Sequence, residues 1–145
     1  MNITRFTDYA LRTLMYVALY QERLITIKEV AERYQISKNH LMKIVQELNI
    51  QGYLVAVRGK NGGIRLGCSP SEINIGKLVR KMEKDSILVE CFGQDNCCVI
   101  SPACQLKHLF AEAMESFFMS LEQYTLADLV APQQQKQLSH LLQLR

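Results

Sequence analysis

The sequence contains no apolar run that approaches the roughly 20 residues needed to cross a bilayer. Its first segment, 1-MNITRFTDYALR-12, carries charged side chains in place of the apolar core of a targeting signal. The sequence therefore predicts a soluble, cytoplasmic chain with no membrane partner. At 145 residues, the chain has the size of one domain with an extension.

Two further features are missing from the stretch 90-ECFGQDNCCVISPAC-104. It has no histidine and no pair of cysteines at the C-x₂-C spacing, although it holds four of the chain's five cysteines. Structural zinc usually draws its ligands in such close pairs, so zinc is disfavoured. Because disulfides are rare in the cytoplasm, metal binding or redox chemistry is favoured over a structural cross-link.

The four thiols follow the pattern Cys91-x₅-Cys97-Cys98-x₅-Cys104. Adjacent side chains diverge, so we expect three thiolates at one metal: Cys91, either Cys97 or Cys98, and Cys104. Three thiolates and a weaker fourth ligand suit an iron–sulfur sensor. Cys104 lies at the N-terminal end of a predicted long helix, where the positive end of the helix dipole favours the thiolate form. A zinc site, a redox disulfide and a reactive nucleophile are the alternatives, whereas Cys68 is expected to pack as an apolar residue.

Positive charge is concentrated in the first half of the chain. Residues 1–67 hold ten Lys and Arg against five Asp and Glu, a net +5, whereas residues 68–145 hold seven against nine, a net −2. A basic first half suits contact with nucleic acid, although a difference of this size also occurs on ordinary solvated surfaces.

Helical periodicity in the basic half predicts a helix-turn-helix. The predicted helices span residues 3–20, 26–34 and 38–50, with N-caps at Thr4, Thr26 and Ser37. Glu29 completes a capping-box pattern with Thr26. The second and third helices are joined by a tight turn, as in a helix-turn-helix.

After Gly52 the sequence changes from helical to strand-like patterning. Two β-prone runs, 53–57 and 64–66, flank RGKNGG, in which Asn-Gly-Gly is expected to supply positive-φ positions for a hairpin. A hairpin directly after a helix-turn-helix is a wing. The predicted fold class is therefore mainly α with a small β-hairpin wing: a winged helix-turn-helix plus a long C-terminal dimerisation helix.

Polar and basic side chains occupy the positions of this fold that face DNA. The first turn of the second helix of a helix-turn-helix meets base edges in the major groove. Asn39 can pair with adenine through two hydrogen bonds, while Lys38 and Lys43 can reach guanine or phosphate. The other candidates are Ser37 and His40 in the same turn, and Arg58, Lys60, Asn61 and Arg65 on a wing narrow enough for a minor groove. The alternative is an ordinary solvated helix face, but the adjacent basic wing favours DNA.

The second half is predicted to hold one more short helix and one long helix. The short helix follows Asn74, its N-cap, with Ile73 and Leu78 as a hydrophobic staple. The long helix is expected to start at Ser101-Pro102 and to end near Tyr124. Its apolar stripe consists of Leu106, Leu109, Phe110, Ala113, Phe117, Leu121 and Tyr124.

Core packing within the monomer is one interpretation of this stripe. We favour dimerisation because a small domain can hardly cover so long a helix by itself. A dimeric helix-turn-helix predicts a palindromic double-stranded operator. The predicted units are the winged helix-turn-helix (1–84), a cysteine-rich cluster-binding loop (85–104), the dimerisation helix and its cap (105–130) and a tail, ordered only in part (131–145).

The sequence also resembles a known family over nearly the whole chain up to residue 130. The segments that carry the resemblance are 5-RFTDYALR-12, 37-SKNHLMKIV-45, 52-GYLVAVRGKNGGIRLG-67, 98-CVISPACQLK-107 and 124-YTLADLV-130. They are similar to the NsrR branch of the Rrf family of winged-helix repressors, which sense nitric oxide through an iron–sulfur cluster. The resemblance implies a homodimer that represses nitric oxide detoxification genes and leaves DNA when nitric oxide attacks its cluster.

The resemblance also implies a ligand set. Cys91, Cys98 and Cys104 would bind the cluster, and Asp8 from the partner subunit's first helix would be the fourth ligand. The alternative for Asp8 is an ordinary first-turn aspartate that interacts with the helix dipole. Cys97 is an additional thiol in a slightly lengthened loop and is the alternative to Cys98.

Lys107 occupies the position at which the related sulfur-assembly regulator has a histidine, which argues against that branch. Three thiols and an uncertain fourth ligand are compatible with a 2Fe–2S or a 4Fe–4S cluster.

The sequence thus predicts a nitric-oxide-sensitive transcriptional repressor, not an enzyme. An iron- or redox-responsive iron–sulfur regulator of the same family is the alternative. A thiol oxidoreductase that uses Cys97 and Cys98 is an alternative of another class, and it is disfavoured because no general base or substrate pocket is visible.

Overall fold

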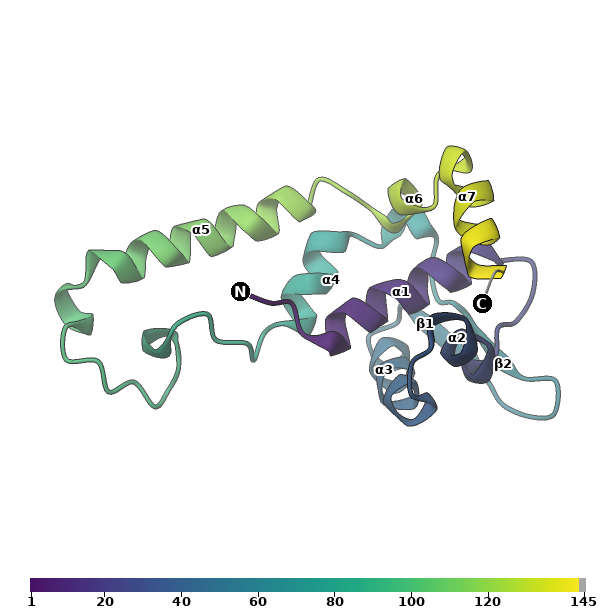
Figure 1. Cartoon of the computed structure of the whole chain (residues 1–145), viewed down its shortest axis with the longest axis horizontal. Helices are drawn as coiled ribbons and strands as arrows, with labels where there is room; N and C mark the ends of the chain where they lie inside the picture. Colours follow the sequence, from purple (N-terminus) through teal and green to yellow (C-terminus); the bar gives the residue numbers. More distant parts are fainter. Residues whose placement is uncertain (144–145) are drawn as a thin grey trace.

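The computed structural model describes residues 1–143, which form a winged-helix body and an arm that extends from it (Figure 1). The body begins with α1 (Arg5–Leu19), α2 (Ile27–Tyr34) and α3 (Lys38–Ile50), followed by strands β1 (Leu54–Val57) and β2 (Gly63–Leu66). Next come α4 (Ile75–Met82), α5 (Gln105–Leu121), α6 (Leu126–Leu129) and α7 (Pro132–Gln143), with short 3₁₀ turns at Pro70–Glu72, Glu90–Phe92 and Ser101–Ala103.

The predicted N-caps of the first three helices are confirmed. The Thr4 side chain accepts a hydrogen bond from Thr7 N, and the Thr26 side chain accepts one from Glu29 N. Ser37 caps α3 in the same way. At α2, one bond of the predicted capping box is formed, from Glu29 N to the Thr26 side chain. The Glu29 carboxylate does not complete the box, because it accepts hydrogen bonds from Tyr16 and Arg23.

One hydrophobic core joins the helices of the body. Its fully buried members on α1, α3, α4 and α6 include Leu14, Ile44, Leu48, Leu78 and Leu126. Each buried side chain of this size contributes about 1.5–3 kcal/mol relative to exposure. The core therefore fixes α3, the second helix of the helix-turn-helix, against α1 and α4.

The wing is a two-stranded antiparallel hairpin with Leu54 opposite Leu66 and Val57 opposite Gly63. Ile25 adds an isolated bridge to Ile64, which ties the hairpin to the chain before α2. The predicted positive-φ positions in Asn-Gly-Gly were wrong, because the residue with positive φ in the turn is Gly59 (φ 112°). Gly62 is needed for a different reason, since a Cβ there would collide with Val57 O.

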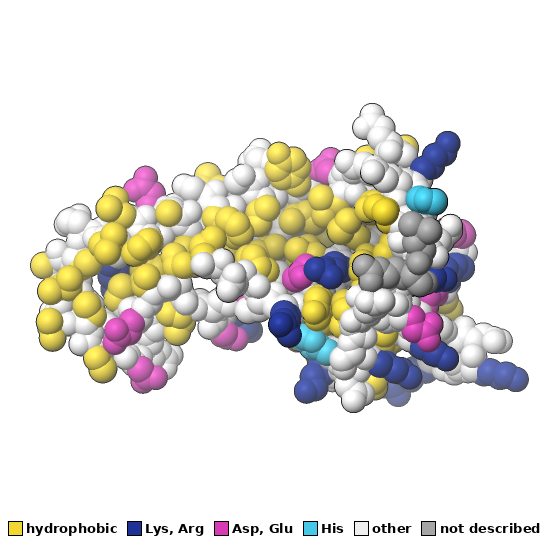
Figure 2. Space-filling view, viewed as in Figure 1, with side chains coloured by type: hydrophobic (Ala, Val, Ile, Leu, Met, Phe, Trp, Pro, Cys, Tyr) yellow, Lys and Arg dark blue, Asp and Glu magenta, His cyan; other side chains and the backbone are white. Residues whose placement is uncertain are grey.

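The arm consists of α5 and the loop that leads to it, and the predicted start of this helix was wrong. Ser101–Ala103 forms a separate 3₁₀ turn, and Cys104 is extended (φ −80°, ψ 113°), so α5 begins at Gln105 and ends before Glu122. No residue of α5 is buried. Figures 1 and 2 show α5 running away from the body with apolar side chains along it.

The tail contains more structure than we expected. Residues 132–143 form α7, whose Leu142 packs against the core near α2. The expectation of a tail ordered only in part was wrong for residues 132–143, because tertiary contact stabilises a helix whose apolar pattern is weak on its own. Among residues 1–143, none of the helices has both the length and the apolar character of a membrane span.

Candidate DNA-binding surface and cysteine loop

The first turn of α3 presents its polar side chains to solvent. Ser37, Lys38, Asn39 and Lys43 are exposed, and His40 is half-buried. Ser37 is held by its capping role, in which its Oγ accepts a hydrogen bond from His40 N at 3.4 Å. The structure therefore places the predicted base-contacting and phosphate-contacting residues on one accessible helix end.

Two aromatic side chains of α1 support the start of α3. The ring of His40 lies 6.3 Å from the Phe6 ring centroid and 5.4 Å from that of Tyr9, which it meets edge-on. The Arg12 guanidinium lies 5.4 Å from the Tyr9 ring centroid and forms a salt bridge with Asp8 at 2.9 Å. Contacts thus run without interruption from Asp8 in the first turn of α1 to the first turn of α3.

The wing carries four further candidates, and all four are exposed: Arg58, Lys60, Asn61 and Arg65. Asn49 of α3 joins the wing to the recognition helix, because its Oδ1 accepts a hydrogen bond from Ala56 N at 3.3 Å. Lys and Arg side chains gather over this end of the body in Figure 2, whereas the arm shows mostly apolar side chains. The basic half of the sequence therefore forms a basic surface.

The cysteine loop is organised by two hydrogen-bonded polar side chains. Glu90 Oε1 accepts from Cys97 N at 2.8 Å. Asn96 Oδ1 accepts from Cys98 N at 2.9 Å, and Asn96 Nδ2 donates to Ser101 Oγ at 2.8 Å. These bonds fix the backbone of the two adjacent cysteines between the two 3₁₀ turns of the loop.

All five cysteines are free thiols. Cys97 and Cys98 are exposed, and Cys91 and Cys104 are half-buried. Cys104 is the N-cap residue of α5, although the sequence predicted Ser101 in that role. Cys68 is half-buried against the core, and burial raises the pKa of its thiol, which fits the predicted packing role.

The donor types in the loop fit an iron–sulfur cluster, because accessible free thiols are the ligands such clusters use. The predicted ligands are not brought together, however. Within residues 1–143, no three His, Cys, Asp or Glu side chains form a group that could hold a metal ion. Asp8 accepts two hydrogen bonds of 2.9 and 3.0 Å from Arg12, so its carboxylate forms an ion pair within α1.

Glu83 is a buried residue that sequence reasoning missed. It is 8% exposed, and its carboxylate accepts hydrogen bonds from Thr4 N (2.7 Å), Thr4 Oγ1 (3.1 Å) and the Ser86 hydroxyl. Burial opposes its charged form, but these hydrogen bonds outweigh burial and lower the pKa of Glu83. Glu83 therefore joins the end of α4 and the start of the cysteine loop to the N-terminus of α1.

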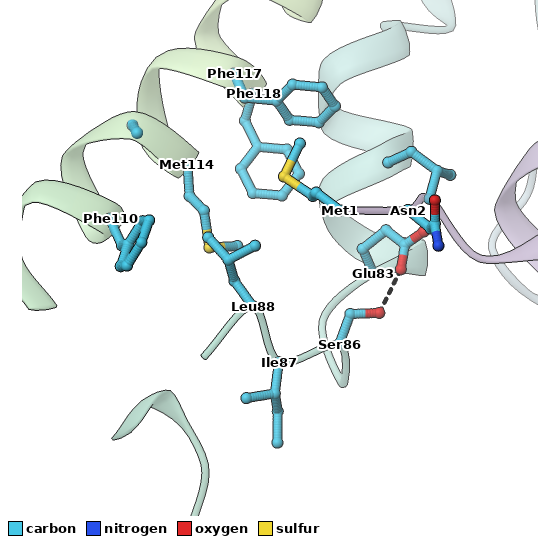
Figure 3. A pocket seen from close by; sticks show the side chains of 12 residues that line it. Met1, Asn2, Glu83, Ser86, Ile87, Leu88, Phe110, Met114, Phe117 and Phe118 are labelled. Atoms are coloured by element: carbon cyan, nitrogen blue, oxygen red, sulfur yellow. Dashed lines mark hydrogen bonds between the residues drawn. The ribbon is translucent and has the colours of Figure 1, made fainter. Parts of the chain in front are cut away.

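An apolar groove of about 430 Å³ lies between the N-terminal segment, the start of the cysteine loop and α5 (Figure 3). Its lining includes Met1, Ile87, Leu88, Phe110, Met114 and Phe117. The sequence predicted the stripe on α5 but not this groove, because the N-terminal segment is brought beside α5 only by the tertiary fold.

Comparison with known proteins agrees with the fold and with the surface just described. The family model described as "Iron-dependent Transcriptional regulator", Rrf2, matches residues 3–132. The HTH-type transcriptional regulator NsrR of Bacillus licheniformis is 48% identical over 92% of this chain and 94% of its own length. NsrR of Oceanobacillus iheyensis is 52% identical over 90% of each chain.

Two solved structures are similar to this one. The oxidized form of CymR from Staphylococcus aureus has a TM-score of 0.73 and 26% identity and covers 90% of this chain and 97% of its own. IscR from T. potens has a TM-score of 0.72 at 22% identity, with 90% and 86% covered. The likeness confirms the predicted winged helix-turn-helix with a long C-terminal helix. The matched family regulates transcription, which sets aside the oxidoreductase alternative.

The family match covers most of the chain, and the curated relatives share about half of its residues. The chain therefore belongs to the Rrf2 family of transcriptional regulators and is a DNA-binding protein of the winged helix-turn-helix type.

Proposed function

We propose that this protein is a cytoplasmic repressor that responds to nitric oxide and binds palindromic operators as a homodimer, with an iron–sulfur cluster held by its cysteine loop. The observation that carries the proposal is the presence of free, exposed or half-buried thiols at positions 91, 98 and 104 in a chain about half identical to NsrR regulators. The NsrR branch, which the sequence resembles, is the branch that senses nitric oxide.

The DNA contact is assigned to α3 and the wing. Asn39 and Lys38 stand at the end of α3 that enters the major groove, and Lys60 and Arg58 stand on the wing beside it. All four side chains are exposed, so none must give up a partner inside the protein core to reach DNA. A dimer of such units reads two half-sites related by two-fold symmetry.

The homodimer is assigned to the arm. Leu106 and Leu109 on α5 are 55% and 60% exposed, and Val99 and Ile100 at the loop tip are 91% and 60% exposed. Soluble proteins rarely leave an apolar patch of this kind uncovered. The apolar groove continues this surface through Phe110, so a second copy can cover both together.

Cys91, Cys98 and Cys104 are the proposed ligands, with Asp8 of the second copy as the fourth. When bound, the cluster supplies an iron centre that reacts with nitric oxide. The chain's own contribution is to place these thiols in a loop that is joined to α1 through Glu83. Since α1 supports the first turn of α3, rearrangement of the loop is expected to alter how α3 meets DNA.

The ligand assignment is tested by alanine substitution followed by measurement of bound iron and sulfide. Cys98→Ala and Cys104→Ala are expected to lose both, whereas Cys97→Ala retains them. Cys68→Ala is the matched control, because this thiol lies outside the loop. Loss of iron in Cys97→Ala with retention in Cys98→Ala would assign the ligand to Cys97 instead.

The coupling is tested by comparing operator affinity of the cluster-loaded and cluster-free forms under anaerobic conditions. We expect the cluster-free protein to bind its operator at least about tenfold more weakly, a free-energy difference of about 1.4 kcal/mol. Equal affinity of the two forms would refute the coupling between the loop and α3. Absence of any preference for one duplex over random DNA would refute specific DNA recognition itself.

A further inference from the structure

One arginine of the body binds three residues of the arm. Arg80 lies on α4, and its partners are Glu115 and Phe118 on α5 and Glu122, the C-cap residue of α5, spaced three and four residues apart. Its Nη1 and Nη2 donate to the two oxygens of Glu115 at 2.8 and 3.0 Å. Its Nε and Nη2 donate to Glu122 Oε1 at 3.2 and 2.9 Å.

The same guanidinium also lies over an aromatic ring, with Arg80 Cζ 4.7 Å from the centroid of Phe118. A planar guanidinium can satisfy a carboxylate through two parallel bonds and stack on a ring at once, which an ammonium group cannot do. These contacts raise the pKa of Arg80 and lower that of Glu115, so both groups are charged at neutral pH. The cluster therefore defines one orientation of α5 relative to α4.

A second contact, one turn earlier on α4, fixes the position of the C-terminal end of α5. Gly76 lies against the backbone of Glu122, where a Cβ would come within 2.7 Å of Glu122 Cα. Asn74 Nδ2 donates to Glu122 O at 2.8 Å, and Ile75 N donates to Tyr124 O at 3.0 Å. Backbone contacts thus make the junction at Glu122 a fixed point from which α5 projects.

The distance between the two contacts makes the arm a lever. Glu115 lies seven residues from Glu122, about 10 Å along the helix, and Cys104 lies 18 residues from Glu122, about 27 Å. A displacement of about 1 Å at Glu115 therefore moves the Cys104 end of α5 by about 2.6 Å. Beyond Glu115, no residue of α5 is buried that would resist this rotation.

We propose that Arg80 is the positioning residue that sets the angle between α5 and the winged-helix body, and thereby the separation of operator half-sites that the dimer accepts. The inference rests on the proposed homodimer through the arm. Because α5 of each copy joins the two bodies, its angle to α4 determines how far apart the two α3 helices lie. Arg80 binds Glu115 and Glu122 and stacks on Phe118, so it acts through α5.

The test measures affinity for the protein's own palindromic operator and for versions with the central spacer lengthened or shortened by one base pair. The wild-type protein is expected to bind the altered spacers at least tenfold more weakly. In Arg80→Gln we expect this discrimination to fall to about threefold or less, with the dimer intact by light scattering. Glu115→Gln, an exposed partner on the arm, is expected to give the same loss.

Arg23→Gln is the matched control. Arg23 also forms a bidentate pair with a glutamate, Glu29, at 2.6 and 2.9 Å, and it also lies over a ring, that of Tyr20 at 5.0 Å. This cluster lies entirely within the body, so its loss must leave spacer discrimination at the wild-type level. Arg80→Lys retains the positive charge but loses the planar guanidinium that donates two parallel hydrogen bonds. We expect it to lose spacer discrimination as Arg80→Gln does.

Unchanged spacer discrimination in both Arg80→Gln and Glu115→Gln would overturn the proposal. The same loss in Arg23→Gln would also overturn it, because the effect would then not be specific to the α4–α5 junction. A wild-type protein that is monomeric, or that prefers no duplex, would instead refute the proposed function on which this inference rests.

Discussion

Substitution of Gly76 by alanine tests whether the end of α5 is held directly against α4. The new Cβ would approach three atoms of one residue, Glu122: its Cα at 2.7 Å, and its backbone N and Cγ more closely still. Overpacking typically costs about 1–3 kcal/mol. Alanine regains about 1 kcal/mol over glycine inside a helix. Because two of the obstructing atoms are backbone and cannot rotate away, we expect the upper end of the cost.

The expected net loss in the free energy of unfolding is therefore about 2 kcal/mol. At about 3 °C per kcal/mol for a chain of this length, the melting temperature falls by about 6 °C. Thermal denaturation followed by circular dichroism measures it, and Lys77→Ala, at the exposed neighbouring position of α4, should change stability by less than about 0.5 kcal/mol. A Gly76→Ala protein as stable as the wild type, or more stable, would refute the close approach of α5 to α4.

Four other variants test separate parts of the structure. Burial raises the pKa values of Tyr16 and Tyr34 to about 12 from 10.0, so the folded state keeps protons that the unfolded state releases. Stability should thus fall between pH 10 and pH 12, and the double variant Tyr16→Phe/Tyr34→Phe should flatten this decline in urea titrations. Asn39→Ala should make the free energy of operator binding less favourable by about 1–3 kcal/mol and relax the sequence preference at one base pair. Lys60→Ala should weaken binding to all duplexes and reduce the slope of log affinity against log salt concentration by about 1, as measured by fluorescence anisotropy. Asn74→Ala removes the N-cap of α4 and its hydrogen bond to the end of α5, and urea denaturation should show a loss of about 1–2 kcal/mol.

The parts of the fold that depend on local chemistry could be predicted from the sequence. Thr4, Thr26, Ser37 and Asn74 cap the helices they were expected to cap, because a capping side chain bonds to a backbone N–H three residues away. The hairpin could be predicted from two β-prone runs on either side of a glycine-rich turn. The sequence did not predict which residue of the turn has a positive φ. Several glycines and an asparagine in this turn offer alternative sites, and close approaches such as that of Gly62 to Val57 O decide among them.

The parts that depend on residues far apart in the chain could not be predicted. The ion pair of Arg80 with Glu115 spans 35 residues of the sequence, and the hydrogen bond between Thr4 and Glu83 spans 79. Neither pairing has a pattern within one helix. The candidate cysteines were identified by their spacing alone, but no local pattern describes how the loop arranges them in space.

The most direct test of the account is an anaerobic titration of the reconstituted protein with nitric oxide, in which visible absorbance and operator binding are measured in the same samples. We expect a broad cluster absorbance that bleaches as nitric oxide is added, with operator released in proportion. A protein that stays colourless after reconstitution with iron and sulfide would contradict the cluster. A coloured protein that keeps its operator while the absorbance bleaches would contradict nitric oxide as the signal and favour an iron- or redox-responsive regulator.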